Sequence, residues 1–537
     1  MAPSYPSADA QPSDENAPFL SPSAHGQEAD PRDYSEPNTP ESNRRRLLVT
    51  LVFILLAVET GGSMIPGPMV RVIESISCDS YWRAHEPGKV PGHGHVPEHL
   101  CNLPAVQTEV ATVKGYSDLL EGLLSTLCAI PYGHFADRHG RRLSIRLTIP
   151  GFVLNGLITT SVLWFNGVFP LRAIWLASFS WIIGGGPTVA LALIWTMLAD
   201  LTADSDRAVL FFRVGLASQV AGFIASAASS GLMAVNPWIP LLFGCGTVMA
   251  GLGGAWSLPE TINLLKVERR GRRDSRERSG SERERRGRKI RSLIRPYLFI
   301  FTPRLLSLLC SFVLSQLALG SSSFLTQYIS TRFNWSLAKA QLLSSLHSLA
   351  TIPVFALLIP YLTNKTLAAL NSSLRDLNIA RSSIFSLSLG CFGIGFSPII
   401  YLLVPSLCIH ALGSGFALAA RSLITGLVQR EETARLYAVV GVMQSIGSVL
   451  GSLVATNAFK AGLNMGGGWI GLVYSKQAIR LFLILCIIRS MPRSTNSILQ
   501  HAPYTATIPS GEPLQTNSFL LFRVTVLHIP SSSSDLL

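Results

Sequence analysis

The stretch Gly133-His134-Phe135-Ala136-Asp137-Arg138-His139-Gly140-Arg141-Arg142 separates two apolar blocks of the chain. Its glycines suit a tight connection, because Gly133 has no side chain to hold helices apart and Gly140 can adopt a positive φ. Asp137 can face a helix N-terminus, which stabilises a negative charge by about 0.3 to 1 kcal/mol. The arginines, Arg138, Arg141 and Arg142, can bind carboxylates and lipid headgroups. This pattern predicts a short basic connection between two helices at a membrane surface.

The sequence on both sides of this connection divides into apolar blocks of a length that suits helices crossing a bilayer, which take about 20 residues each. The first six blocks cover residues 47–70, 115–135, 144–166, 172–198, 208–232 and 238–258. The other six cover residues 305–328, 338–362, 382–402, 404–428, 436–459 and 467–488. Lys476 and Arg480 interrupt the last one, so a short or irregular helix is expected there. We predict an all-α polytopic membrane protein with about twelve transmembrane helices.

Composition supports the membrane interpretation and argues against nucleic acid as a partner. The 537 residues are 48% hydrophobic and only 14% charged, with a mean hydropathy of +0.37, which is too apolar for ordinary soluble domains. The net charge of +13 comes mostly from the run between Arg269 and Arg304, which separates the two sets of blocks. A basic run in that position favours a loop beside the membrane, in contact with the lipid bilayer.

A weak internal repeat predicts two pseudo-symmetric six-helix bundles. The stretch from Ala208 to Gly215 aligns with the stretch from Ala434 to Gly441, and each enters the fifth block of its half. The expected parts are a disordered tail at 1–46, a first bundle at 47–261, a basic linker at 262–304, a second bundle at 305–488 and a tail at 489–537.

The positive-inside rule predicts that both termini are cytoplasmic, since Arg44 to Arg46, the Arg138 to Arg146 connection and the basic linker then share one side. The region from Arg71 to Lys114 becomes an outer loop. It holds Cys78 and Cys101, which can pair in an oxidising compartment or stay separate. It also holds His85, His93, His95 and His99, which we interpret as solvated residues rather than a metal site. The plasma membrane and the vacuolar membrane both remain open.

The Gly133 to Arg142 stretch, placed between the second and third of twelve blocks, resembles the signature loop of the major facilitator superfamily. The stretches Ala199-Asp200 to Asp206-Arg207-Ala208 and Ser257-Leu258-Pro259-Glu260-Thr261 extend the resemblance. It implies the fold of that superfamily and a cytoplasmic gate, in which Asp137 meets the eleventh helix near Thr433 and a motif arginine meets Asp200. The chain is loosely similar to fungal members, the proton-coupled folate transporter group and tetracycline-efflux-like members. The counterpart in the second half, from Asn364 to Arg381, is degenerate, which puts a symmetric second latch in doubt.

Glu59 is the leading candidate for coupling transport to protons, because it lies about halfway along the first block. A charge at the bilayer centre costs about 2.5 to 3.5 kcal/mol on insertion scales, so it is expected to face a cavity or a partner. A carboxylate reached in turn from each side of the membrane can bind and release a proton. A permanently paired or inert carboxylate is the alternative.

Further polar residues within the blocks are candidates for binding the solute. Arg213 and Arg421 can anchor an anionic group of the substrate, or they can serve as gate latches or interfacial residues. His347 and His410 can handle protons, or they can form packing hydrogen bonds. Gly184-Gly185-Gly186-Pro187 favours close packing or a break in the fourth block over a phosphate loop.

The sequence therefore predicts a monomeric secondary active transporter that moves a small solute by alternating access, coupled to protons. A transporter-like nutrient sensor is the alternative, because the polar N-terminal tail and the charged linker could signal. No nucleophile with a base, metal cluster or phosphate loop stands out, so we expect neither an enzyme nor a cofactor. Substrate identity and the direction of transport do not follow from the sequence.

Overall fold

The computed structural model describes residues 41–89, 95–202, 204–257, 302–362, 372–425, 428 and 433–489. All regular structure in these ranges is helical. Eleven helical segments there are long and apolar enough to cross a membrane. The helix α3 (Pro104–His139) has 36 residues and carries more charge than the others. With α3 the set matches the predicted fold of about twelve transmembrane helices, which is confirmed.

The first half, called the N-half below, contains six spans in chain order. The first span bends at Ile65, where Pro66 opens the second helix, since proline lacks an amide hydrogen and suits a helix start. The elements of the N-half are α1 (Glu41–Met64), α2 (Pro66–His85), η1 (Pro87–Lys89), η2 (Glu98–Leu100), α3, α4 (Arg141–Trp164), η3 (Leu171–Ile182), α5 (Gly186–Asp200), α6 (Asp204–Val235), α7 (Trp238–Gly253) and η4 (Gly254–Trp256).

The second half, called the C-half, repeats this order of spans with more interruptions. Pro353 precedes a π-helical turn, Val354–Leu358, in the second span of this half. The elements are α10 (Pro303–Leu319), η6 (Gly320–Phe324), α11 (Leu325–Phe333), α12 (Leu337–Pro353), η7 (Val354–Leu358), α13 (Ile359–Tyr361), α14 (Ser372–Phe396), α15 (Ile400–Leu412), η9 (Gly413–Gly415), α16 (Phe416–Thr425), α17 (Thr433–Met465), η10 (Gly467–Gly471) and α18 (Leu472–Arg489).

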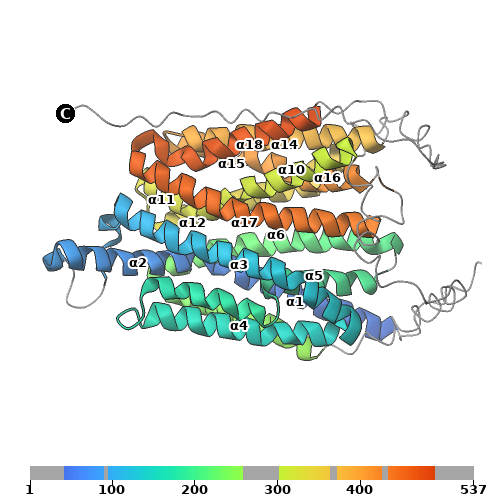
Figure 1. Ribbon diagram of the computed structural model, residues 1–537, viewed down its shortest axis with the longest axis horizontal. Helices are drawn as coiled ribbons and strands as arrows, with labels where there is room; N and C mark the ends of the chain where they lie inside the picture. Colours follow the sequence, from blue (N-terminus) through green and yellow to red (C-terminus); the bar gives the residue numbers. More distant parts are fainter. Residues whose placement is uncertain are drawn as a thin grey trace, which may run out of the picture. The chain divides into compact units, whose positions relative to one another are not determined.

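The two halves meet along two pairs of helices. The helix α3 lies beside α17, and α6 lies beside α12 (Figure 1). Each half also has its own apolar core. One core gathers Leu51, Ile54 and Ile194 in the N-half, and another gathers Leu308, Phe312 and Ile384 in the C-half. Lipid chains are as apolar as these side chains, so close packing rather than exclusion from water stabilises each core.

Glycines set the closest helix contacts and the main break in the N-half. A Cβ at Gly61 would lie 2.6 Å from the carbonyl oxygen of Gly244, so α1 and α7 pack backbone to backbone. Gly184, Gly185 and Gly186 have φ values of 102°, 80° and 73°, which L side chains rarely adopt. Gly184 and Gly185 lie between η3 and α5, and Gly186 begins α5, which confirms the predicted break in the fourth span.

Several predicted boundaries are wrong. The region from Arg71 to Lys114 is not one outer loop, because α2 continues to His85 and α3 already begins at Pro104. Buried polar side chains in this region, such as Glu74 and Gln107, bond to each other, as described below. The ninth span begins at Ser372 rather than 382, and α18 is a regular helix of 18 residues despite Lys476 and Arg480.

The described residues also limit what can be compared with the predicted parts. The helix α1 already begins at Glu41, before the predicted boundary at residue 47. Most of the predicted linker at 262–304 and the tail at 490–537 lie outside the described residues, as do residues 1–40, 90–94 and 258–261. The predicted domain boundaries therefore stay predictions.

Candidate functional site

Glu59 lines a polar cavity that both halves contribute to, called the interface cavity below. The cavity has a volume of about 380 Å³. Its walls come from α1, α5, α6 and α12: Glu59, Ser63, Trp195, Gly215, Ser218, Gln219, Gly222, Ser226 and Ser348. The side chain of Glu59 is half-buried and forms no hydrogen bond or ion pair with another described residue. A carboxylate in this setting can accept a proton or a cationic group of a ligand.

Glu59 also borders a second cavity of about 700 Å³ inside the N-half, called the N-half cavity below. The helix α3 places Lys114, Asp118 and Glu121 on its wall, and their spacing of four and three residues puts them on one helix face. Lys114 Nζ lies 2.8 Å from Asp118 Oδ2. Lys114 Nζ also lies 5.8 Å from the ring centroid of Phe324 in the C-half.

Sequence reasoning missed these three residues of α3. The predicted second block covers residues 115–135, so Lys114 falls in the predicted outer loop and is separated from the carboxylates of Asp118 and Glu121. A cation followed by carboxylates at helical spacing, inside a segment long enough to span, is the signal that could have found them.

The two candidate histidines are partners of each other. His347 Nε2 lies 2.8 Å from His410 Nδ1, and the two rings are 4.9 Å apart between centroids. The contact joins α12 to α15, within the C-half. One ring must donate and the other accept, so this geometry needs one nitrogen without a hydrogen. Neither histidine lines either of the two cavities described above.

The two candidate arginines occupy different settings. Arg213, in α6, is exposed and forms no hydrogen bond or ion pair with another described residue. Arg421, in α16, donates from Nη2 to Oε1 of Gln444 in α17 over 3.0 Å. Neither side chain lines the interface cavity or the N-half cavity. The structure therefore does not bring Glu59, Arg213 and Arg421 together at one wall.

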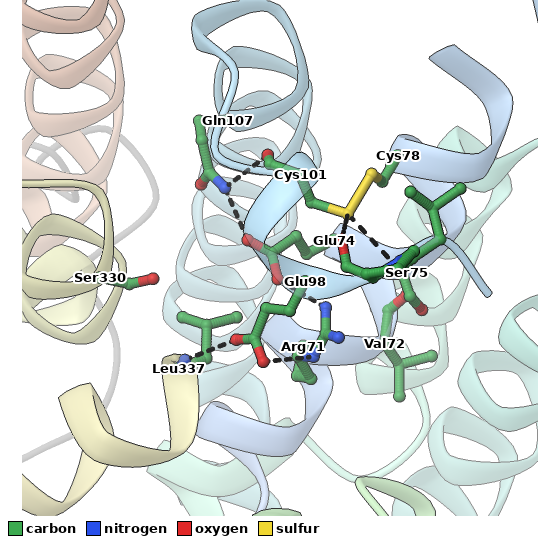
Figure 2. A network of polar contacts seen from close by, with 12 residues as sticks. Arg71, Val72, Glu74, Ser75, Cys78, Glu98, Cys101, Gln107, Ser330 and Leu337 are labelled. Carbon is green, nitrogen blue, oxygen red and sulfur yellow. Dashed lines mark hydrogen bonds and ion pairs between the residues drawn. A yellow bond between two sulfur atoms is a disulfide. The ribbon is translucent and has the colours of Figure 1, made fainter. Parts of the chain in front are cut away.

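The end of the N-half near α2 and η2 carries a polar network around a disulfide, called the disulfide end below (Figure 2). Cys78 in α2 and Cys101 after η2 form the disulfide bond. Glu74 is 2% exposed and accepts from Arg71 over 2.8 Å and from Gln107 Nε2 over 2.6 Å. This burial of a carboxylate is compensated by two donors, one of them charged.

The disulfide end holds the two halves together through direct hydrogen bonds. Glu98 Oε1 accepts from the backbone amide of Leu337 over 2.7 Å, so a residue of the N-half caps the N-terminus of α12 (Figure 2). A negative charge at a helix N-terminus is stabilising. Gln327 Nε2 donates to the backbone oxygen and to Oε1 of Gln107 over 3.0 and 2.8 Å. Asn102 donates to Asn334 as well. These bonds connect the N-half to α11, to α12 and to Asn334 between them.

The predicted outer histidines do not gather into a metal site among the described residues. No group of three or more histidine, cysteine or acidic side chains there could hold a metal ion. His95 Nδ1 instead lies 2.5 Å from Asp79 Oδ2. His93 lies outside the described residues.

The glycines of the signature stretch differ in their roles. Gly140 has φ 99° and links α3 to α4, which confirms the predicted positive φ. The expectation that Gly133 allows a close helix contact is wrong within the described residues, because no atom of a neighbouring helix there lies within 4 Å of where its Cβ would stand.

Among the arginines of the signature stretch, Arg141 has a backbone contact in the part of the chain that the structure describes. Arg141 Nη1 donates to the carbonyl oxygen of Thr196 over 2.8 Å, one turn before the end of α5. Arg142 has a buried Nε with no partner among the described residues, and Arg138 is exposed. The side chains of Asp137, Asp200, Arg207 and Thr433 lie outside the described residues, so the predicted gate contacts stay predictions.

An arginine in each half binds the end of that half's last span. Arg146 in α4 donates to the carbonyl oxygens of Ala255 and Trp256 over 3.3 and 2.6 Å. Arg381 in α14 donates to the carbonyl oxygens of Ile488 and Arg489 over 3.0 and 3.3 Å. Both neutralise carbonyl groups that a helix C-terminus leaves without partners. Arg381 thus has a structural equivalent, although the loop before it is degenerate in sequence.

Comparisons with known proteins agree with this architecture. The model of the Major Facilitator Superfamily matches residues 111–452. The MFS-type transporter aprT of Aspergillus flavus is 42% identical over 501 residues, which cover 92% of this chain and 98% of that protein. The MFS efflux pump atnC of Emericella nidulans is 29% identical over 475 residues, covering 87% and 90%. The crystal structure of a D-xylose-proton symporter has a TM-score of 0.55 at 13% identity, covering 83% of this chain and 98% of that one, and shows the fold alone.

Proposed function

Because this chain belongs to the major facilitator superfamily, as a multi-pass helical membrane protein, we propose that it is a proton-coupled secondary transporter that exports a small organic solute. The family and the relatives named as transporters and efflux pumps support transport and the outward direction. They give no support to a nutrient sensor.

Glu59 carries the proposal. It is a half-buried carboxylate in the wall of the interface cavity, with no hydrogen-bond or ion-pair partner among the described residues. A membrane protein retains a costly group of this kind where it serves a function. We infer that Glu59 binds a proton when the cavity faces one side of the membrane and releases it when the cavity faces the other.

The closed disulfide end supports alternating access. Glu98 and Gln107 of the N-half bond to α12 and α11 of the C-half. If this end faces the exterior, as the positive-inside rule predicts, the present conformation is closed outward. Export then requires these contacts to break while the opposite end closes. The arginines of the signature stretch are proposed to take part in that second closure.

Transport in proteoliposomes tests this function. The purified chain is reconstituted, the membrane potential is clamped with K⁺ and valinomycin, and rhodamine 123, fluorescein and Nile red serve as cationic, anionic and neutral probes. A pH difference of one unit corresponds to about 1.4 kcal/mol, so exchange of one proton per solute sustains about tenfold accumulation of the transported probe. We expect Glu59→Gln to reduce accumulation to about the equilibrium ratio of one while downhill movement remains.

The matched control is Glu109→Gln. Glu109 lies on α3, where it pairs with Arg172 over 3.0 Å at a partly exposed position outside both cavities. This variant should retain the full accumulation. Accumulation by Glu59→Gln that still follows the pH difference would remove the proposed role of Glu59.

A further inference from the structure

The N-half cavity has the size and walls of a ligand site, although it lies within one half rather than between the two. Its volume of about 700 Å³ falls in the range of small-molecule sites, roughly 300 to 1,000 Å³. Met69, Phe152, Trp181 and Met249 make an apolar wall, and Glu59, Lys114, Asp118 and Glu121 form a charged one. A ligand that fits both walls is amphipathic.

The charged wall carries more carboxylates than cations. The pair of Lys114 and Asp118 is neutral as a unit. Glu59 and Glu121 form no hydrogen bond or ion pair with another described residue. An uncompensated carboxylate away from water is costly, and a ligand with a positive charge would remove that cost. The charge of this wall therefore favours a cation over an anion.

The apolar wall suits a cation with an aromatic or bulky body. The rings of Phe152 and Trp181 meet edge to face, with centroids 4.9 Å apart. Aromatic faces attract cations held within about 6 Å. Trp181 is 4% exposed, and its Nε1 has no hydrogen-bond partner among the described residues.

We propose that the N-half cavity binds amphipathic organic cations, with Glu121 as the main charged contact. The proposal deepens the proposed function, on which it rests for the view that the bound cation is a transported solute. Glu59 borders both cavities, so a cation held by Glu121 lies along the same wall as the proton-binding carboxylate. Binding itself needs neither a gradient nor transport.

Two ions of nearly the same size and shape but opposite charge show how much of the binding affinity depends on the charge of the ligand. Binding of tetraphenylphosphonium and of tetraphenylborate to the full chain in nanodiscs is measured by scintillation proximity, with empty nanodiscs subtracted. We expect the cation to bind at least about tenfold more tightly than the anion. Glu121→Gln should weaken cation binding about tenfold, as expected for one lost charged contact. Glu109→Gln, on the same helix, should change it less than about twofold.

Blocking variants locate the bound cation. Gly156 and Gly62 line the N-half cavity. A Cβ added at either position would have no described atom of another element within 4 Å, so a larger side chain can extend into the cavity. Gly156→Leu or Gly62→Leu should therefore weaken tetraphenylphosphonium binding about tenfold or more. Gly215 lines the interface cavity and has open space as well, so Gly215→Leu is the matched control and should leave binding unchanged.

The outcomes separate this proposal from the proposed function. Equal binding of both ions, an unchanged affinity in Glu121→Gln, or loss in Gly215→Leu without loss in the other two leucine variants would overturn it. Size-exclusion profiles identify variants that do not fold, and Glu121→Asp, which retains the charge, should bind the cation better than Glu121→Gln. The test leaves Glu59 unchanged and uses no gradient, so proton-driven transport can hold or fail independently.

Discussion

The N-half and the C-half share a scaffold but not an interior. Arg146 and Arg381 bind the ends of equivalent spans, and α6 and α17 occupy equivalent places at the interface. The interiors differ, because the N-half has carboxylates beside two cavities, whereas the polar contacts of the C-half include the paired His347 and His410. The arginines that bind helix C-termini therefore occupy equivalent positions in the two halves, whereas the polar side chains inside the two halves differ.

This difference suggests a division of work between the halves. The candidate proton and cation contacts lie in the N-half, on α1 and α3. The C-half contributes Ser348 to the interface cavity, and it supplies α11 and α12 to the contacts that close the disulfide end. Substitutions at helix contacts test whether the two halves are each held together in the same way, and substitutions of single arginines test whether individual polar contacts are equivalent.

The largest effect is expected where helices touch through their backbones. A Cβ at Gly61 would lie 2.6 Å from the oxygen of Gly244, and one at Gly447 would lie 2.4 Å from the oxygen of Val313. Gly61→Val and Gly447→Val should each destabilise their half by about 3 kcal/mol, the upper range for overpacking. Thermal unfolding of the purified variants measures this.

Gly62→Ala and Gly441→Ala are the matched controls, since a Cβ at either position has open space. Each should leave the melting temperature unchanged or raise it slightly, because alanine favours helix. A large loss from Gly61→Val without one from Gly447→Val would mean that the two scaffolds are not held in the same way.

An intermediate loss of stability is expected when the arginines that bind the C-terminal ends of the last spans are replaced. Arg146→Ala and Arg381→Ala should each lower stability by about 1.5 kcal/mol, the lower range for hydrogen bonds to charged groups. Urea titration followed by helix content measures both. Arg138→Ala, at an exposed residue of the signature stretch, should change stability by less than about 0.5 kcal/mol. Losses that differ strongly between Arg146 and Arg381 would break the equivalence.

The smallest effect should distinguish the two arginines that the sequence alone treats alike. Arg421→Ala removes the hydrogen bond to Gln444 and should lower stability by about 1 kcal/mol. Arg213→Ala should change it by less than about 0.5 kcal/mol, because the side chain is exposed and has no partner among the described residues. Thermal unfolding again reports the difference, and a larger loss from Arg213→Ala would contradict its assignment as an exposed side chain.

The fold could be predicted from the sequence because lipid imposes a simple length rule. Blocks of apolar residues gave the spans, and glycines identified the turn at Gly140 and the break at Gly184 to Gly186. Hydropathy failed at α2 and α3, where Arg71, Glu74 and Lys114 suggested a loop. A helix can carry such residues when other helices supply partners, and those partners are far away in the sequence.

The candidate site could be predicted only in part for the same reason. Glu59 stood out because one charge interrupts an apolar run. Gln107 and Gln327 are 220 residues apart, and only the packing of α3 and α11 brings them together. The contact between His347 and His410 likewise depends on the packing of α12 and α15. Spacing along one helix is visible in a sequence, but the register between two helices is not.

The disulfide bond between Cys78 and Cys101 restricts the chain segment that contacts the C-half at the disulfide end. It joins residues 23 apart, and in the chain-entropy description a crosslink of this span removes roughly 3 kcal/mol of conformational freedom from the unfolded chain. Glu98 sits inside the crosslinked segment, so its carboxylate is preorganised for the amide of Leu337. If the proposed transport cycle operates and this end faces outward, the disulfide keeps Glu98 near Leu337 during each outward closure, and reduction of the disulfide should slow that closure.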